Sequence, residues 1–164
     1  MLHLKTRLAK GITVAAASAA VITAAAGIAA ASTSGPDITT ASTIHLIARG
    51  GSSTFINIRH QTRPAVGDEV ILSQPLFNAA HPSQLVGHGY VTVIFVKPRN
   101  VTQDHATLVL RHGQIDVAGI QASNPFRLAV TGGTGRYRNA RGQATVKLLP
   151  GPGNRASITL SLLP

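Results

Sequence analysis

The chain has 164 residues, 44% of them hydrophobic and 12% charged, which is enough for one domain with a real core. It contains no cysteine, so a disulfide framework and a lipid-modified cysteine are both excluded. The formal net charge is +10, a balance that favours an anionic wall polymer, a membrane surface or a nucleic acid as partner. The basic residues are scattered, however, and with two Tyr, four Phe and no Trp the stacking platform for single strands is missing. We therefore predict no nucleic acid partner.

The first 31 residues have the pattern of a secretory signal peptide. Lys5, Arg7 and Lys10 precede an uncharged run, mostly Ala, Val and Ile, that ends in Ala29-Ala30-Ala31, and small residues of this kind form a cleavage site. An uncleaved membrane anchor is the alternative, because the uncharged run could just span a bilayer. We predict an N-terminal signal helix within residues 1–31, a flexible linker over 32–42, and a secreted protein with no stable membrane association after cleavage.

From residue 43 onwards the sequence becomes a series of short runs in which apolar and polar side chains alternate, the two-residue period of β-strands. Turn signals separate the runs, among them a predicted turn at Gly50-Gly51, and no stretch has convincing helical spacing. The predicted strands are 44–48, 54–58, 69–77 with a break, 85–96, 106–110, 114–120, 126–130, 143–148 and 157–163. Residues 43–164 are therefore predicted to form one all-β domain, as a single sheet or barrel.

Two of these strands are apolar on both faces. Val91, Val93 and Phe95 lie opposite Ile94 and Val96 in the alternation, and Val109 lies between two leucines of the next strand. A strand buried on both faces has one side in a barrel interior and the other against a neighbour. This pattern favours a barrel that also oligomerises over a sandwich with one solvated face.

The segment from Phe126 to Val146 reads as strand, glycine-rich corner, strand. Its Thr131-Gly132-Gly133-Thr134-Gly135 resembles a dinucleotide-binding turn, but such a turn needs a helix after it and an acidic residue about 20 positions on. No Asp or Glu follows Asp116. We interpret Gly132, Gly133, Gly135 and Gly142 as a structural corner, because glycine reaches positive φ without steric cost.

Residues 130–142, Val-Thr-Gly-Gly-Thr-Gly-Arg-Tyr-Arg-Asn-Ala-Arg-Gly, resemble the V-x-G-G-T-G-x-[FY]-x-x-A-R-G signature of dirigent proteins and the allene oxide cyclase barrel-like family. Residues 64–70 together with 75–77, residues 85–90 and residues 106–115 resemble further segments of that family, in the same order. The resemblance implies an eight-stranded antiparallel β-barrel, usually a homotrimer, with a largely apolar pocket for a small hydrophobic ligand. It also implies an isomerase-like or dirigent-like activity that steers cyclisation or stereoselective coupling, with no cofactor. Lignan-coupling dirigent proteins have an acidic residue directly after the corner where this chain has Arg136, which puts phenoxy coupling in doubt.

Four residues are candidates for the wall of such a pocket. Asp68 would be a rim carboxylate or would satisfy backbone N–H groups in the Gly67 turn. Arg141 would bind an anionic ligand or bridge the corner to a neighbouring carbonyl. His88 and Tyr90 share strand parity with Thr92, so they would form a polar stripe facing the interior, although His88 is also consistent with an ordinary, partly exposed histidine.

Other chemistries have little support in the sequence. No two histidines lie at a usual ligand spacing beside a carboxylate, so we predict no metal site. Ser52-Ser53 lacks the strand–turn–helix context of a nucleophile elbow. The competing functions are then a ligand-steering barrel, the same barrel as a non-catalytic binding or structural module at the cell exterior, and a basic wall-binding or nucleic-acid-binding protein.

Overall fold

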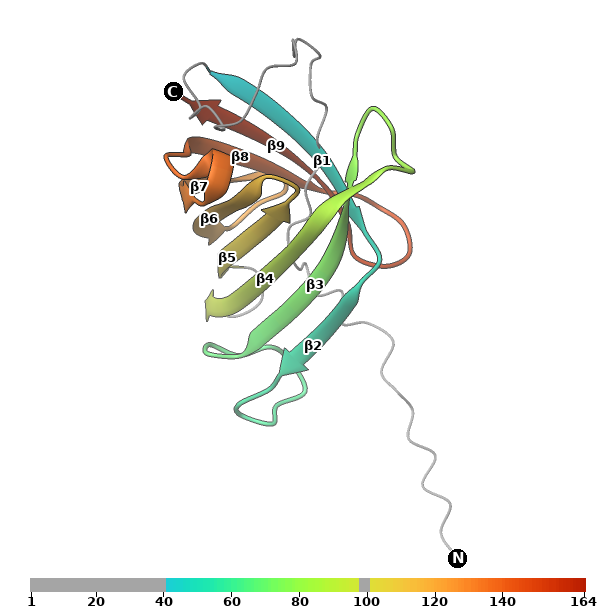
Figure 1. Cartoon of the computed structure of the whole chain (residues 1–164). Helices are drawn as coiled ribbons and strands as arrows, with labels where there is room; N and C mark the ends of the chain where they lie inside the picture. Colours follow the sequence, from blue (N-terminus) through green and yellow to red (C-terminus); the bar gives the residue numbers. More distant parts are fainter. Residues whose placement is uncertain (1–40, 98–100) are drawn as a thin grey trace, which may run out of the picture.

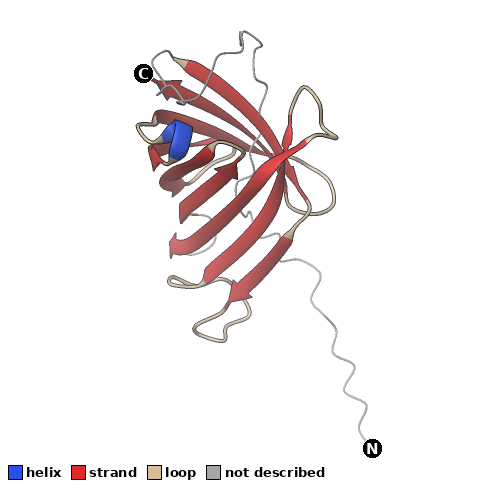
Figure 2. Ribbon diagram, viewed as in Figure 1, coloured by secondary structure: helices blue, strands red, loops and turns tan. Residues whose placement is uncertain are grey.

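The structure is a computed structural model that describes residues 41–97 and 101–164. Nine antiparallel strands make up one sheet: β1 (Ser42–Arg49), β2 (Ser52–Ile56), β3 (Glu69–Asn78), β4 (Leu85–Lys97), β5 (Val101–Leu110), β6 (Gly113–Gln121), β7 (Phe126–Gly133), β8 (Arg141–Leu148) and β9 (Arg155–Leu163). The described part of the chain has one helical element, the 3-10 turn η1 (Gly135–Tyr137), seen at one end of the sheet in Figure 2. The predicted signal peptide, its helix and the linker up to residue 40 lie outside the described residues. The first strand begins at Ser42, two residues before the predicted strand 44–48.

The sheet closes on itself. Its strand order is β1-β9-β8-β7-β6-β5-β4-β3-β2, and β1 also pairs with β3 through Leu46↔Asn78, Ile47↔Phe77 and Ala48↔Leu76. Eight strands, all except β2, therefore form a closed barrel (Figure 1). The prediction of an all-β, eight-stranded antiparallel barrel is confirmed.

The ninth strand comes from a break in what would otherwise be one long strand. β1 pairs with the last three residues of β3, while β2 pairs with its first half through Ser52↔Ser73 to Ile56↔Glu69. Gly50 and Gly51 lie between them with φ of +74° and +90°, a backbone region that glycine enters at low cost. A Cβ on Gly51 would lie 2.1 Å from the carbonyl oxygen of Ser73. Because of this kink, β2 extends the sheet beyond the ring at one end.

The barrel interior is the core of the protein. Along the strands every second side chain is buried, as in β4, where Val91, Val93 and Phe95 are buried while Tyr90 and Val96 are exposed. Nine large apolar side chains are almost completely hidden from solvent: Leu46, Leu72, Leu76, Leu108, Ile115, Leu128, Ile158, Leu160 and Leu162. Burial of this apolar area is the main source of stability. The expectation that one face of β4 packs inside a barrel is confirmed.

The glycine corner is a single 3-10 turn that rests on the neighbouring hairpin. The N–H of Arg136 donates to the His112 oxygen at 2.9 Å, and Thr134 and Gln114 exchange two hydrogen bonds of 2.9 and 3.1 Å. A Cβ on Gly133 or Gly135 would lie 2.4 Å from a backbone oxygen of this hairpin. Gly142, with φ of +134°, faces the Ser161 oxygen in the same way. Gly132 differs, since a Cβ there would meet nothing within 4 Å.

Candidate functional site

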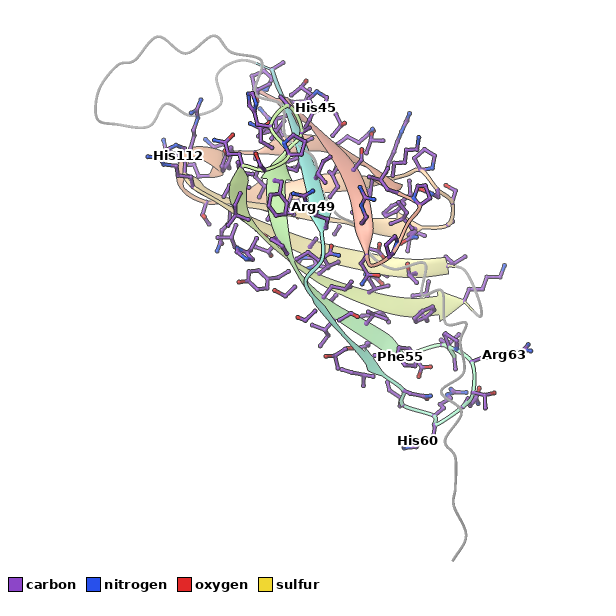
Figure 3. The ribbon with its side chains drawn as sticks, turned by 90° about the vertical axis from the view of Figure 1, so that its right-hand side faces the viewer. His45, Arg49, Phe55, His60, Arg63 and His112 are labelled. Carbon is purple, nitrogen blue, oxygen red and sulfur yellow. The ribbon has the colours of Figure 1, made fainter. Side chains whose placement is uncertain are left out.

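The two ends of the barrel differ in character. At the η1 end, η1 lies against the turn between β5 and β6. At the other end, β4 ends and β5 begins. The loop 57–68 between β2 and β3 also lies there, because the N–H of Gly67 donates to the Phe95 oxygen of β4 at 2.9 Å. We call this the Asp104 end. Figure 3 shows His112 at one extreme of the molecule and His60 and Arg63, in loop 57–68, at the opposite one.

A group of buried polar side chains marks the Asp104 end of the interior. Thr102 and Asp104 share the inward parity of β5, and Gln121 pairs opposite Thr102 on β6. Asp104 is 0% exposed, Thr102 3% and Gln121 4%. The Thr102 hydroxyl donates to the Asp104 carboxylate at 2.6 Å. Buried charged and polar groups are costly in an apolar barrel, so their gathering at one end points to a chemical role there.

Aromatic rings lie beside this polar group. Phe95 pairs with Thr102 across the β4–β5 ladder and is 5% exposed. Phe55 of β2 meets Phe95 edge to face, with ring centroids 6.4 Å apart. Phe126, at the start of β7, is also buried. The Asp104 end therefore combines a carboxylate, a hydroxyl and an amide with buried aromatic rings.

Asp68 lies at the same end but faces its own loop. Its carboxylate accepts hydrogen bonds from the backbone N–H groups of Ile58 at 2.9 Å and Ala65 at 2.8 Å. Its carbonyl oxygen accepts another from the Phe95 N–H at 2.9 Å. With 0% of its surface exposed, Asp68 fastens loop 57–68 to the end of β4. This arrangement corresponds to the structural alternative weighed for it from sequence.

The other three candidate residues lie elsewhere. His88 and Tyr90 are exposed on the outer face of β4, with Tyr90 52% exposed, so the predicted stripe does not line the interior. Arg141 is exposed at the start of β8, at the η1 end, where its Nε donates to the Pro164 oxygen at 3.0 Å. That contact is the carbonyl bridge considered as an alternative to ligand binding. The structure therefore does not bring the four residues together.

A fifth polar side chain faces the interior away from this cluster. Gln74 is 1% exposed on the inner face of β3, between Leu72 and Leu76. Its Nε2 donates to the Asn154 oxygen at 3.2 Å, while its Oε1 is buried without a hydrogen-bond partner. The side chain reaches the loop before β9, so it links β3 to β9 beside the kink between β1 and β2.

Sequence reasoning missed Thr102, Asp104 and Gln121. The predicted strand began at residue 106, whereas β5 begins at Val101. Extending the alternation backwards from Leu110, Leu108 and Ala106 reaches Asp104 and Thr102 on the same buried face. That parity was the available signal. It was hidden because Thr-x-Asp does not look like an inward-facing strand.

Two further features of the described residues bear on function. No group of three or more His, Asp or Glu side chains in them is placed to hold a metal ion. No helix within residues 41–97 and 101–164 has the length and apolar character needed to cross a membrane.

The barrel places the chain among proteins with the dirigent and cyclase fold, and solved structures support this. No family model matches the sequence, and no curated protein matches it. Pyocyanin demethylase is similar at 26% identity and a TM-score of 0.61, over 71% of this chain and 97% of that chain. A pterocarpan synthase dirigent protein is similar at 16% identity and a TM-score of 0.62, over 76% of this chain and 94% of that one.

An exo-specific intermolecular Diels–Alderase gives 18% identity and a TM-score of 0.58, over 75% of this chain and 98% of that chain. At such identities the dirigent protein and the Diels–Alderase share the fold with this chain. The resemblance to dirigent-like and cyclase-like barrels is thereby confirmed at the level of structure.

Proposed function

We propose that this protein is a secreted barrel that binds a small, mostly apolar organic molecule at its Asp104 end and guides the cyclisation or coupling of that molecule. The observation that carries the proposal is the buried Thr102–Asp104 pair, with Gln121 opposite, in an otherwise apolar interior. The shared fold with a dirigent protein and a Diels–Alderase supports the reaction class.

The physical basis is orientation. Rigid apolar walls hold a flexible substrate in one of its many conformers, and this positioning alone lowers the barrier of a unimolecular or coupling step. Phe95 and Phe126 supply flat surfaces for an unsaturated or aromatic molecule. The Asp104 carboxylate, held by the Thr102 hydroxyl, accepts a hydrogen bond from the substrate or stabilises positive charge that develops on it.

The alternative is a binding module with the same ligand and no turnover. A barrel that only stores or carries its ligand needs shape and apolar contact but no carboxylate. The two functions therefore differ in what happens when Asp104 loses its charge. Ligand binding by a non-catalytic module should persist after that change. Conversion of the ligand should be lost if the reaction depends on the carboxylate.

Mass spectrometry of small molecules that co-purify with the exported native protein is the first experiment. Pyocyanin is the first compound to add, because the structure of a pyocyanin demethylase is similar at 26% identity. Its binding is followed by absorbance titration and its conversion by chromatography. We expect a bound or converted unsaturated compound. The proposal would be contradicted if the protein is recovered with no bound compound and neither binds nor converts pyocyanin or other flat heteroaromatic compounds.

Asp104→Asn is the informative variant, because it keeps the shape of the side chain and removes its charge. We expect this variant to bind ligand within a fewfold of the wild type and to lose most of any conversion. Asp116→Asn is the matched control, since Asp116 is half-buried on β6 and accepts a hydrogen bond from Thr107. Equal losses in both variants would refute a special role for Asp104.

The assembly is proposed as a homotrimer, in line with the family resemblance. Light scattering of the purified protein measures this directly. A monomer at micromolar concentration would refute the proposal on oligomeric state and would leave the proposal on Asp104 unaffected.

A further inference from the structure

The fully exposed charged side chains on the described part of this barrel have one sign. Of the five acidic residues in the sequence, Asp37 lies outside the described residues. Asp68 and Asp104 are buried, and Glu69 and Asp116 are half-buried. Every charged side chain that is exposed in residues 41–97 and 101–164 is therefore an Arg or Lys. The positive surface is a property of how the fold hides its acids as well as of composition.

The positive charge is also unevenly distributed along the barrel. Asp68, Glu69 and Asp104 all lie at the Asp104 end, as the pairs Glu69↔Ile94 and Val93↔Asp104 and the contact of Asp68 with Phe95 show. These carboxylates offset part of the basic charge in that region. At the η1 end, Asp116 is the nearest described acid, opposite Gly132 in the β6–β7 ladder.

The fold brings together basic side chains at the η1 end that are separate in sequence. The Arg136 N–H bond to His112 places η1 against the turn that contains Arg111. Arg138 directly follows η1 as its C-cap residue. We call Arg111, His112, Arg136 and Arg138 the arginine end; all four side chains are exposed. Arg141, at the start of β8, bonds Pro164 and is not counted in this set.

We propose that the arginine end binds an anionic polymer rich in phosphate groups, and that this surface is separate from the site in the barrel interior. Guanidinium groups pair with phosphate through two parallel hydrogen bonds, and several of them on one surface act together on a repeating anion. Nucleic acid is the less favoured polymer, because the set contains no exposed Phe, Tyr or Trp side chain on which a base could stack.

Long-chain inorganic polyphosphate is the probe, and its binding is measured over a range of salt concentrations. The double variant Arg111→Gln/Arg136→Gln removes two charges from the arginine end. Arg59→Gln/Arg63→Gln removes two exposed charges from loop 57–68 at the opposite end. Both variants have the same net charge, so the comparison separates position from total charge.

We expect the arginine-end variant to bind polyphosphate about tenfold more weakly near ~0.1 M salt, with the log–log salt slope smaller by about two. The variant in loop 57–68 should bind like the wild type. Equal weakening in both variants, or no binding by the wild type, would overturn the proposal. Tighter binding to single-stranded DNA than to polyphosphate would overturn the choice of polymer. Ligand binding at the Asp104 end is measured in parallel and should not change.

Discussion

The carboxylate of Asp68 accepts a hydrogen bond from the backbone N–H of Ala65 at 2.8 Å, three residues earlier in the chain. The same carboxylate accepts a second bond from Ile58, ten residues earlier. One buried side chain thus fixes both ends of loop 57–68, which connects β2 to β3. The loop has few bonds of other kinds to the barrel, apart from the two between the Gly67–Asp68 backbone and Phe95.

Replacing Asp68 should therefore destabilise the protein. Asp68→Ala leaves two N–H groups without their acceptor, and hydrogen bonds to charged groups contribute about 1.5–3 kcal/mol each, so we expect a loss of about 3 kcal/mol in the free energy of unfolding. Asp68→Asn keeps one acceptor oxygen and should lose about half as much. Urea denaturation measures both. Identical stability of Asp68→Ala and the wild type would show that the loop does not depend on this carboxylate.

The four corner glycines should differ sharply when each is replaced by alanine. Gly142 has φ of +134°, and a Cβ there would lie 2.1 Å from the Ser161 oxygen, so Gly142→Ala should cost about 3 kcal/mol or more. Gly132 has open space around its Cβ position, so Gly132→Ala should change stability by less than about 1 kcal/mol. Thermal unfolding of the two variants tests this. A similar cost at both positions would contradict the account of the corner.

The Thr102 hydroxyl should affect stability and ligand conversion through its hydrogen bond to Asp104. Thr102→Val has nearly the same shape but removes the donor that lies 2.6 Å from the carboxylate, and it should cost about 1–3 kcal/mol because the buried carboxylate loses this hydrogen bond. Thr102→Ser retains the hydroxyl and should retain ligand conversion. If Thr102→Val converts ligand as well as Thr102→Ser does, the hydroxyl does not position the carboxylate.

Tyr137 gives a pH-dependent prediction. Burial raises the pKa of Tyr137 above its ordinary value of 10.0, and the neighbouring Arg136 opposes this in part. Because the folded state holds the proton more tightly than the unfolded state, this contribution to stability is complete below pH ~10 and is lost as the pH rises through the folded-state pKa.

The protein has two tyrosines, so Tyr90→Phe leaves Tyr137 as the only phenol to titrate by ultraviolet absorbance. We expect its ionisation above pH ~10 in the folded protein. Ionisation below that value would show that Tyr137 is not desolvated. The Tyr137→Phe variant should lose less stability between neutral and alkaline pH than the wild type.

The sequence was sufficient to predict an all-β domain, because alternation and turn residues are local signals. The eight-stranded barrel was implied by the family resemblance. Successive residues of β4, such as the exposed Tyr90 and the buried Val91, show the two-residue period directly. The glycine corner reduced the number of possible topologies, because it carries the family resemblance. The kink at Gly50–Gly51 was predicted as a turn, whereas the chain continues there along the same neighbour, β3. A pair of glycines alone does not distinguish a reversal from a bend.

The candidate site was harder to predict than the fold. Which face of a strand points inward is decided by the whole barrel, so the polar stripe of His88 and Tyr90 was compatible with either face from sequence alone. The structure places it outside, because Val91 and Val93 occupy the interior. Asp104 went unnoticed because a buried carboxylate contradicts the usual preference of strand interiors. Its position follows from pairing with Val93 across the sheet.

The closure between β1 and β3 has a mechanical consequence. Only three residue pairs join these strands, whereas eight join β1 to β9. The barrel is therefore least firmly hydrogen-bonded at the β1–β3 ladder, next to the kink. A bulky ligand would widen the barrel there while the other ladders stay intact. Amide hydrogens of Leu76 to Asn78 should exchange with solvent sooner than those of Ile158 to Leu160, and the size of molecule that the protein admits would depend on that weak line.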